Sequence, residues 1–255
     1  MEITCEQYKR IESYFPIQRG NVKNDNLQVL NAILYTAEHG CKWRGLPKRF
    51  GNWHTIYMRM NRWAKNGVLD RIFEALQREN IIQIRVEAVS LDSTMVKVHP
   101  DGTGALKKNG PQAIGKSRGG WTTKIHMVAA GPRAAVNFLL SPGHVHDAAP
   151  GRELLKATDI QAGFVIMDRA YEGDETRQLV LDLGMIPVVP PKTNRIFAWE
   201  YDREMYKKRN EVERLFRRLK GYRRIFSRFD KLDVVFMFFI YFALITDTLF
   251  SVNTP

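Results

Sequence analysis

Apolar and polar positions follow two different periods along this chain, and the change of period divides it into regions. Up to about residue 80 the apolar residues recur every three or four positions, which predicts amphipathic helices. We expect these helices at 4–15, 25–38 and 54–66, with a fourth that begins near Val68. Beyond residue 85 short apolar runs typical of strands take over, so a helical region precedes a mixed one.

The helix expected at 54–66 carries both an apolar and a basic face. Ile56, Met60 and Trp63 share the apolar face, and the cations on the other face are Arg59, Arg62 and Lys65. Several short helices with one basic, aromatic-containing member are typical of a helix-turn-helix module. A small helical cap with a solvated basic face explains the same pattern equally well. We therefore expect an all-α, helix-turn-helix-like DNA-binding domain at 1–80 and keep the cap as its alternative.

The middle of the chain reads as strands and helices in alternation. We expect a strand at 86–98, a β-hairpin at 121–130 and 134–140, a helix at 149–157, a strand at 164–167, a helix at 175–183 capped by Asp174, and a strand at 186–189. This order predicts an α/β fold for residues 85–231, a mixed five-stranded sheet with flanking helices.

Two aspartates accompany the strands of this region. Asp92 lies inside the first strand, although aspartate is depleted in strands, and Asp168 ends the strand at 164–167. A buried or cleft-facing carboxylate needs a compensating charge or a metal ion. Because strand ends gather functional groups in α/β sheets, Asp92 and Asp168 are expected to converge.

The segment 206–220, YKKRNEVERLFRRLK, contains no Gly or Pro and predicts one continuous helix. At 100° per residue one stripe of this helix holds Tyr206, Arg209, Glu213, Arg217 and Lys220, and a separate apolar stripe holds Val212, Leu215, Phe216 and Leu219. A solvated helix laced with salt bridges is the plainer interpretation. The two upstream aspartates favour a functional site that includes Glu213.

The net charge limits the class of partner. The chain carries a formal charge of +12, with +5 in residues 1–80, +2 in 81–200 and +7 in 201–231. A strongly basic protein of this kind favours a polyanion, most simply nucleic acid. The long Gly-rich loop at 100–120 adds four more candidate DNA-binding cations: Lys107, Lys108, Lys116 and Arg118.

Two other features concern metals and thiols. His144, His146 and Asp147 could form a zinc site, but such close spacing is a weak signal, and a polar turn before the next helix is the stronger interpretation. Cys5 and Cys41 lack CxxC spacing, which favours reduced thiols in a cytoplasmic protein.

The last region of the chain, 232–255, is expected to be a terminal helix that packs on the catalytic domain. Its apolar run at 234–245 has 12 residues, too few to span a bilayer. An acidic, polar start at Met1 and Glu2 argues against a signal peptide. No membrane association is expected.

Three segments carry a resemblance to a known family. They are LDSTMVKVH (91–99), VIMDRAYEGD (165–174) and YKKRNEVERLFRRLK (206–220). Together they resemble the signature of bacterial insertion-sequence transposases of the DDE class, the insertion-sequence-five group above all. The last segment fits that group's Tyr-x2-Arg-x3-Glu-x6-Lys pattern in full. Further similar segments are KSRGGWTTKIH (116–126), CKWRGLPKRFGNW (41–53), and the flanks 221–224 and 228–231.

The resemblance implies an RNase H-like fold in which Asp92, Asp168 and Glu213 are the catalytic, metal-binding triad. It implies a two-ion Mg²⁺ site, with Mn²⁺ as a substitute, and cleavage and strand transfer at the terminal inverted repeats. The implied partners are double-stranded DNA, both ends and target, and a second copy of the chain in a dimer on DNA, in the bacterial cytoplasm near the nucleoid. Arg209, Arg217 and Lys220 would then hold DNA phosphates, and Tyr206 would pack or touch DNA.

Two other interpretations stay open. A catalytically retired transposase could act as a DNA-binding regulator, although the presence of all three acids argues against it. Another RNase H-like nuclease, such as a junction resolvase, would need no sequence-specific N-terminal module.

Overall fold

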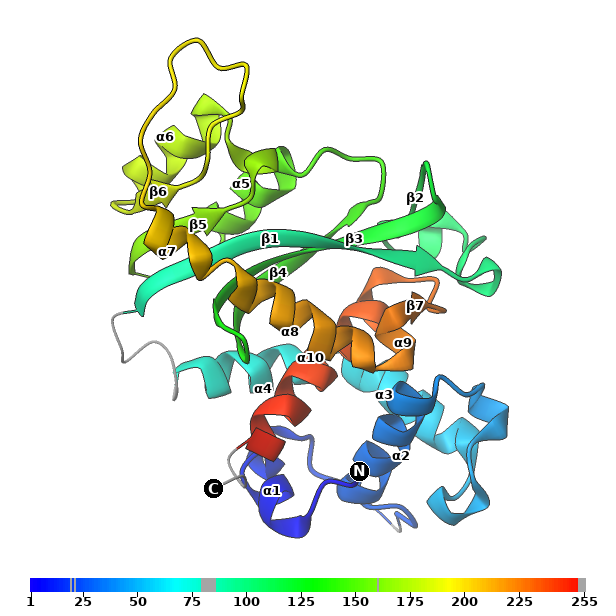
Figure 1. Cartoon of the computed structure of the whole chain (residues 1–255). Coiled ribbons are helices and arrows are strands. Elements are labelled where there is room, and N and C mark those ends of the chain that lie inside the picture. The colour runs from blue at the N-terminus through cyan, green and yellow to red at the C-terminus, as the bar shows by residue number, and fades with distance from the viewer. Residues whose placement is uncertain (19, 21, 79–85, 160, 252–255) are drawn as a thin grey trace. The chain divides into compact units, whose positions relative to one another are not determined.

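A computed structural model describes residues 1–18, 20, 22–78, 86–159 and 161–251. The chain forms two compact units, coloured by residue number in Figure 1. Unit 1 comprises residues 1–76, 99–112 and 219–255, and unit 2 comprises residues 77–98 and 113–218. The division into 1–80, 85–231 and 232–255 stays a prediction.

Unit 1 is built from helices. Its elements are α1 (Cys5–Lys9), α2 (Asn26–His39), α3 (Trp53–Lys65), α4 (Val68–Gln77, which ends at the unit boundary), α9 (Arg223–Phe226), the short strand β7 (Ser227–Arg228) and α10 (Asp233–Ser251). The predicted N-terminal helices are present, except that the first is the short α1 followed by a 3-10 turn at Glu12–Tyr14. Asn52 starts α3 because its side chain accepts hydrogen bonds from the backbone N–H groups of His54 (2.8 Å) and Thr55 (3.4 Å).

The C-terminal helix α10 is longer than the sequence predicted. Its 19 residues are long and apolar enough to cross a membrane by length and composition, so the prediction of a span too short for a bilayer was wrong. However, 56% of its most apolar window is buried inside the protein. Within unit 1, α10 packs against α3 and α9, with Phe236, Phe239 and Ile240 fully buried. A buried core helix passes the same length test as a membrane span, so the apolarity of α10 is explained by this packing.

Unit 2 holds the sheet. Its elements are β1 (Val86–Val98), β2 (Gly115–Ser117), β3 (Gly120–Gly131), β4 (Ala134–Pro142), α5 (Ala148–Lys156), β5 (Ala162–Met167), α6 (Asp174–Asp182), β6 (Ile186–Val188), α7 (Arg203–Lys207) and α8 (Asn210–Gly221, which crosses the unit boundary). The strand order is β2-β3-β1-β5-β6, and β4 also pairs with β3, so the predicted count of five strands was too low. β3 is antiparallel to both β1 and β4, whereas β1, β5 and β6 are parallel. The mixed α/β fold and the predicted hairpin are confirmed, and the arrangement is RNase H-like.

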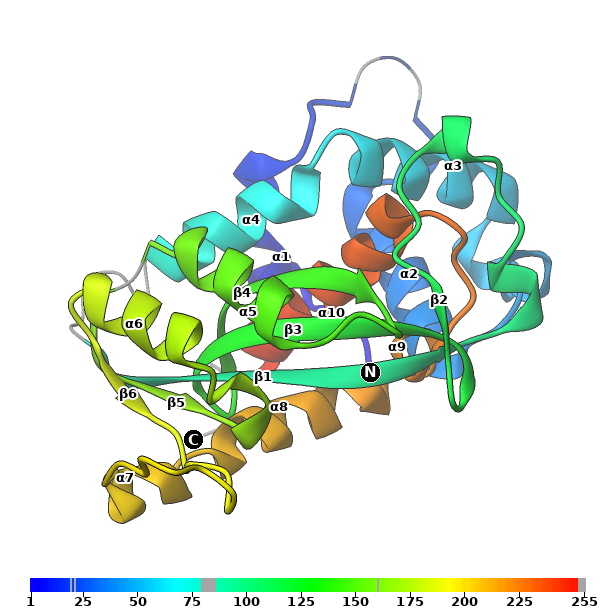
Figure 2. The ribbon, with the colours of Figure 1, turned by 90° about the horizontal axis from the view of Figure 1, so that it is seen from above.

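Two layers of helices cover the sheet of unit 2. Val89, Leu91, Val165 and Met167 pack with buried residues of α5 and α6, whereas Ile166 and Val188 pack with Met205 of α7. Figures 1 and 2 show α5 and α6 on one face and α7 with α8 on the other. Since successive residues of a strand point to opposite faces, the even-numbered positions of β1 and β5 face α7 and α8.

The predicted helix at 206–220 is interrupted. Tyr206 lies in α7, which ends at Lys207. A turn follows at Lys208 and Arg209, and α8 begins at Asn210. Arg209 N–H donates to the Tyr206 carbonyl at 3.0 Å, a hydrogen bond that spans three residues instead of the four of an α-helix. The prediction of one continuous helix over 206–220 was therefore wrong at Lys208 and Arg209. Its apolar stripe is confirmed, because Val212, Leu215, Phe216 and Leu219 are buried.

Candidate active site

Asp92 and Asp168 lie next to each other on neighbouring parallel strands. Leu91 of β1 and Met167 of β5 are partners in the sheet register, and each aspartate is the next residue along its strand. Residues in register on parallel strands point to the same face, here the face covered by α7 and α8. Asp168 ends its strand and accepts a hydrogen bond from the Arg169 backbone N–H at 2.7 Å. The predicted convergence of the two aspartates is thus built into the register.

Arg209 links the sheet to helix α8. Its guanidinium lies 3.5 Å from Asp92 Oδ2 and 2.7 Å from Glu213 Oε1. The side chain of Asp92 is 13% exposed and that of Glu213 is 40% exposed. Arg209 lies in the turn at 208–209, directly before α8. A carboxylate on a strand and one on a helix therefore share one cation.

The neighbouring acids and the burial of Asp92 shift the pKa of its carboxyl group. Burial raises the pKa of Asp92, and the nearby charges of Asp168 and Glu213 raise it further. The Ser93 backbone N–H, which donates to Asp92 Oδ1 at 2.7 Å, and the charge of Arg209 both lower it. The net effect raises the pKa of Asp92 from 3.8 to about 6. At neutral pH the site therefore carries a carboxylate that is costly to keep ionised.

The pKa of Arg209 is affected by all three acids. Burial lowers its pKa, but the neighbouring groups Tyr206, Glu213, Asp92 and Asp168 outweigh burial, and the pKa of Arg209 is raised. Among the described residues no group of three His, Cys, Asp or Glu side chains is close enough to hold a metal ion. The guanidinium sits between Asp92 and Glu213, where it neutralises part of their charge. Carboxylates alone, with no thiol or imidazole, form the donor set that suits a hard divalent cation, so these residues fit one.

A group of buried, hydrogen-bonded polar side chains lies on the opposite face of the sheet from Asp92. His126 of β3 lies 2.8 Å from the Ser141 hydroxyl and 3.4 Å from the Tyr171 hydroxyl. Tyr171 also interacts with the Ser93 side chain, next to Asp92, and the pKa of Tyr171 is raised by burial. The sequence analysis did not predict these hydrogen-bonded side chains. Tyr171 and His126 both lay inside the segments that carry the family resemblance, which was the available signal.

The predicted DNA-binding cations are mostly exposed. The exposed ones are Arg62, Lys65, Lys108, Lys116, Arg118 and Arg217, and Lys220 is half-buried. Arg59 differs, because its guanidinium donates to the Asn24 carbonyl at 2.9 Å and is partly buried. Its role in DNA binding stays a prediction. The side chain of Lys107 lies outside the described residues.

The polar turn at 143–147 is confirmed as a turn before α5. Lys124 donates to the Val145 carbonyl and to Asp147 Oδ1, both at 2.8 Å, and His146 Nδ1 accepts from the Ala148 N–H at 3.3 Å. Asp174 was wrong as a helix cap, because it is the first residue of α6 and pairs with Arg195 at 2.6 Å. Cys5 and Cys41 are free thiols.

Sequence comparison identifies the class of proteins to which this mixed α/β chain belongs. A family model described as "Transposase DDE domain" matches residues 87–246, so the chain belongs to the DDE-domain transposases. A second, described as "Putative transposase of IS4/5 family", matches residues 3–73. The protein is a bacterial insertion-sequence transposase of this class.

Two relatives match parts of the chain. It is 32% identical over 123 residues to "Putative transposase for insertion sequence element IS6501" of Brucella ovis, covering 48% of this chain and 94% of that protein. It is 35% identical over 109 residues to "Uncharacterized protein y4sN" of Sinorhizobium fredii, covering 41% of this chain and 83% of that protein.

Solved structures are less similar in sequence to this chain than the two relatives are. The piggyBac transposase in a synaptic complex with hairpin DNA is 11% identical with a TM-score of 0.41, over 74% of this chain and 47% of that one. The Mos1 transposase in a paired-end complex is 12% identical with a TM-score of 0.28, over 72% of this chain and 66% of that one. The chain thus spans about half the length of the piggyBac chain.

Proposed function

We propose that this transposase binds the terminal inverted repeats of its element and catalyses metal-dependent cleavage of a DNA strand, followed by strand transfer. The observation that supports this most strongly is that Asp92 and Glu213 share the guanidinium of Arg209, with Asp168 beside Asp92 on the neighbouring strand. Acids gathered in this way are costly in a purely structural role, because like charges repel and Asp92 is also desolvated. Such a cluster is typical of a site that serves chemistry.

In this proposal the two aspartates share one role and the glutamate has another. Asp92 and Asp168 are fixed by the sheet and provide the rigid part of a divalent-cation site, while Glu213 on α8 completes it. When bound there, two Mg²⁺ ions, or Mn²⁺ in their place, would activate the attacking oxygen and neutralise charge at phosphorus. Arg209 neutralises the same carboxylates beforehand and is then free to bind a DNA phosphate.

The buried polar side chains on the other face keep Asp92 in place. Tyr171 interacts with Ser93, and His126 stays neutral beside it because burial lowers its pKa to about 4. A neutral imidazole can accept from one hydroxyl and donate to another, so the chain Ser141–His126–Tyr171 holds its geometry at neutral pH. We expect these residues to position Asp92 and to make no contact with DNA.

DNA binding follows from the exposed cations. Arg62 and Lys65 lie on the solvent side of α3, and we propose that this helical region reads the inverted repeats. Arg217 and Lys220 on α8, and Lys116 and Arg118 at β2, would bind phosphates of end or target DNA. Two copies of the chain would act on the two ends of the element, in the bacterial cytoplasm at the nucleoid.

A cleavage assay with the element's own ends tests this proposal. The substrate is a labelled duplex that carries the inverted repeat flanking the gene, with Mg²⁺ or EDTA. The wild-type chain should cut it with Mg²⁺ only, and Asp168→Asn should bind the duplex without cutting it. Binding with no cutting by the wild-type chain would favour a retired transposase that regulates. Cutting of unrelated duplexes at equal rates would favour a nuclease without end specificity.

A further inference from the structure

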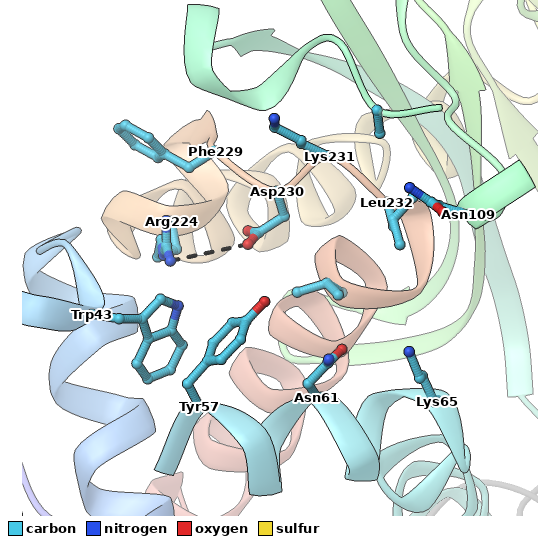
Figure 3. Close-up of a pocket in the computed structure, with 12 residues that line it drawn as sticks. Trp43, Tyr57, Asn61, Lys65, Asn109, Arg224, Phe229, Asp230, Lys231 and Leu232 are labelled. Carbon is cyan, nitrogen blue, oxygen red and sulfur yellow. Dashed lines mark ion pairs between the residues drawn. The ribbon is translucent and has the colours of Figure 1, made fainter. Parts of the chain in front are cut away.

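Unit 1 contains a cavity of about 380 Å³ that the proposed chemistry does not use. Figure 3 shows how segments far apart in the sequence line it: Trp43 before α3, Tyr57 and Lys65 on α3, and Phe229 and Asp230 between α9 and α10. Both 41–53 and 228–231 are segments that carry the family resemblance, yet neither contains a proposed catalytic residue. A volume of this size is within the range of small-molecule sites.

Aromatic rings form part of the cavity wall. Trp43 and Tyr57 meet edge to face with centroids 5.5 Å apart, and Phe229 lies on the opposite side in Figure 3. The Arg224 guanidinium lies 5.9 Å from the Trp43 ring centre and 5.4 Å from that of Phe229. Aromatic and guanidinium faces stack on flat conjugated rings, and every nucleobase has such a face.

The polar part of the wall is a loosely paired acid and base. Arg224 Nη2 and Asp230 Oδ1 are 4.0 Å apart, a contact drawn as the dashed line in Figure 3, and their side chains are 7% and 10% exposed. Asp230 Oδ2 and Arg224 Nε are both buried without a hydrogen-bond partner. Leaving buried polar atoms unpaired destabilises a fold, so each such atom requires an explanation. Both residues line the cavity, one with an unpaired acceptor and the other with an unpaired donor.

The remaining polar groups around the cavity suit a phosphate. Lys65 and Lys231 are exposed and line the cavity, and Figure 3 draws them on opposite sides of it. Asn61 and Asn109 add amides that can both donate and accept hydrogen bonds. A ligand that matches the whole lining has a flat ring, an edge with a donor beside an acceptor, and an anionic group.

We propose that this cavity binds an unstacked nucleobase of a DNA strand. The base would stack against the aromatic wall while the lysines hold its phosphate, and Asp230 and Arg224 would turn to expose their unpaired atoms, so that Oδ2 accepts a hydrogen bond from the base and Nε–H donates one to it. Every base has a donor next to an acceptor on its pairing edge, so each can satisfy both orphaned atoms. A bare phosphate would leave Asp230 unpaired, and an apolar ligand would satisfy neither atom. The conclusion that the base comes from a DNA strand rests on the proposed DNA binding.

The test compares two labelled duplexes that differ only in one extra, unpaired base. Fluorescence anisotropy should show that the full wild-type chain binds the bulged duplex about tenfold more tightly than the paired one, the gain expected from stacking one base. Tyr57→Ala and Asp230→Asn should bring this ratio close to one. Lys65→Ala should lower it, whereas Arg62→Ala, on the same helix but outside the cavity, should weaken both duplexes equally.

Controls separate the possible outcomes. Circular dichroism melting checks each fold, and if Asp230→Asn fails to fold, Tyr57→Ala and Lys65→Ala still decide the result. A wild-type ratio of one, or an equal loss on both duplexes in Tyr57→Ala, overturns the proposal. Deoxynucleoside monophosphates provide a separate arm: if they bind while the ratio stays at one, the cavity takes a free nucleotide and the strand is excluded. Absence of binding to either duplex would contradict the proposed DNA binding instead.

Discussion

Replacing Asp92 with Asn should stabilise the metal-free protein at neutral pH. The pKa of Asp92 is raised to about 6, chiefly by burial and then by Asp168 and Glu213. An acid whose pKa is higher in the folded state binds its proton more tightly there. Its ionisation therefore costs stability above pH 6, and that cost disappears as the pH falls from 6 towards 4. Two pKa units correspond to about 3 kcal/mol.

Urea unfolding followed by circular dichroism in EDTA measures this effect. At pH 8 we expect Asp92→Asn to unfold with a free energy up to about 3 kcal/mol above wild type, and at pH 4.5 the gain should shrink to about 1 kcal/mol. Asn Oδ1 can still accept from the Ser93 N–H, so that hydrogen bond is kept. Asp159→Asn, an exposed carboxylate of unit 2, is the matched control and should change little at either pH.

Addition of Mg²⁺ extends the same experiment. Ligand at a hundredfold its dissociation constant stabilises the protein that binds it by about 2.7 kcal/mol. The wild-type chain should gain stability with Mg²⁺, whereas Asp92→Asn should gain much less. If Asp92→Asn is no more stable than wild type at pH 8, or if its gain is the same at pH 4.5, the charge of Asp92 is not strained and the reasoning fails.

Three further predictions concern the surroundings of the site. The pKa of His126 is lowered to about 4 by burial, so its contribution to stability is complete above pH 6.5 and is lost as the pH falls towards 4. In the Asp92→Asn background, the free energy of unfolding at pH 5 should be about 2 kcal/mol lower than at pH 8. His126→Gln should remove most of this difference. Arg209→Ala should lower the unfolding free energy in EDTA at pH 8 by about 1 kcal/mol, because Asp92 and Glu213 lose their shared cation, and Mg²⁺ should restore part of the loss. Arg62→Ala should weaken binding to any duplex and reduce the slope of log affinity against log salt by about 0.9, measured by anisotropy titration; an unchanged slope would contradict a phosphate contact.

The positions of the two aspartates could be predicted from local pattern. Asp92 and Asp168 each follow an apolar strand residue, and the period of two together with parallel pairing fixes their common face. The apolar stripe of α8 likewise predicted which side of the helix is buried. These features depend on residues near each other in sequence, so periodicity is sufficient to find them.

What the sequence did not reveal depends on contacts between distant segments. Helix propensity around Lys208 and Arg209 is high on both sides, so no local pattern predicts the turn in which Arg209 lies. The hydrogen bond from Arg59 to the Asn24 carbonyl joins residues 35 positions apart. The cavity in unit 1 and the group of polar side chains around His126 also depend on residues far apart in the sequence. Tertiary packing decides such features, and no pattern within one segment encodes them.

The most direct test of the central claim compares two glutamates of helix α8. Glu213 Oε1 is 2.7 Å from Arg209, whereas Glu211, two residues earlier, points about 200° away around the helix. Both Glu213→Gln and Glu211→Gln remove one charge from the same helix, so each controls for the other. The measurement is the rate at which each cuts one labelled inverted-repeat duplex with Mg²⁺. We expect Glu213→Gln to bind the duplex at least as well as wild type and cut it about a thousandfold more slowly, and Glu211→Gln to cut at nearly the wild-type rate. If Glu211→Gln is the inactive variant, or Glu213→Gln cuts normally, Glu213 is not the third acid of the site.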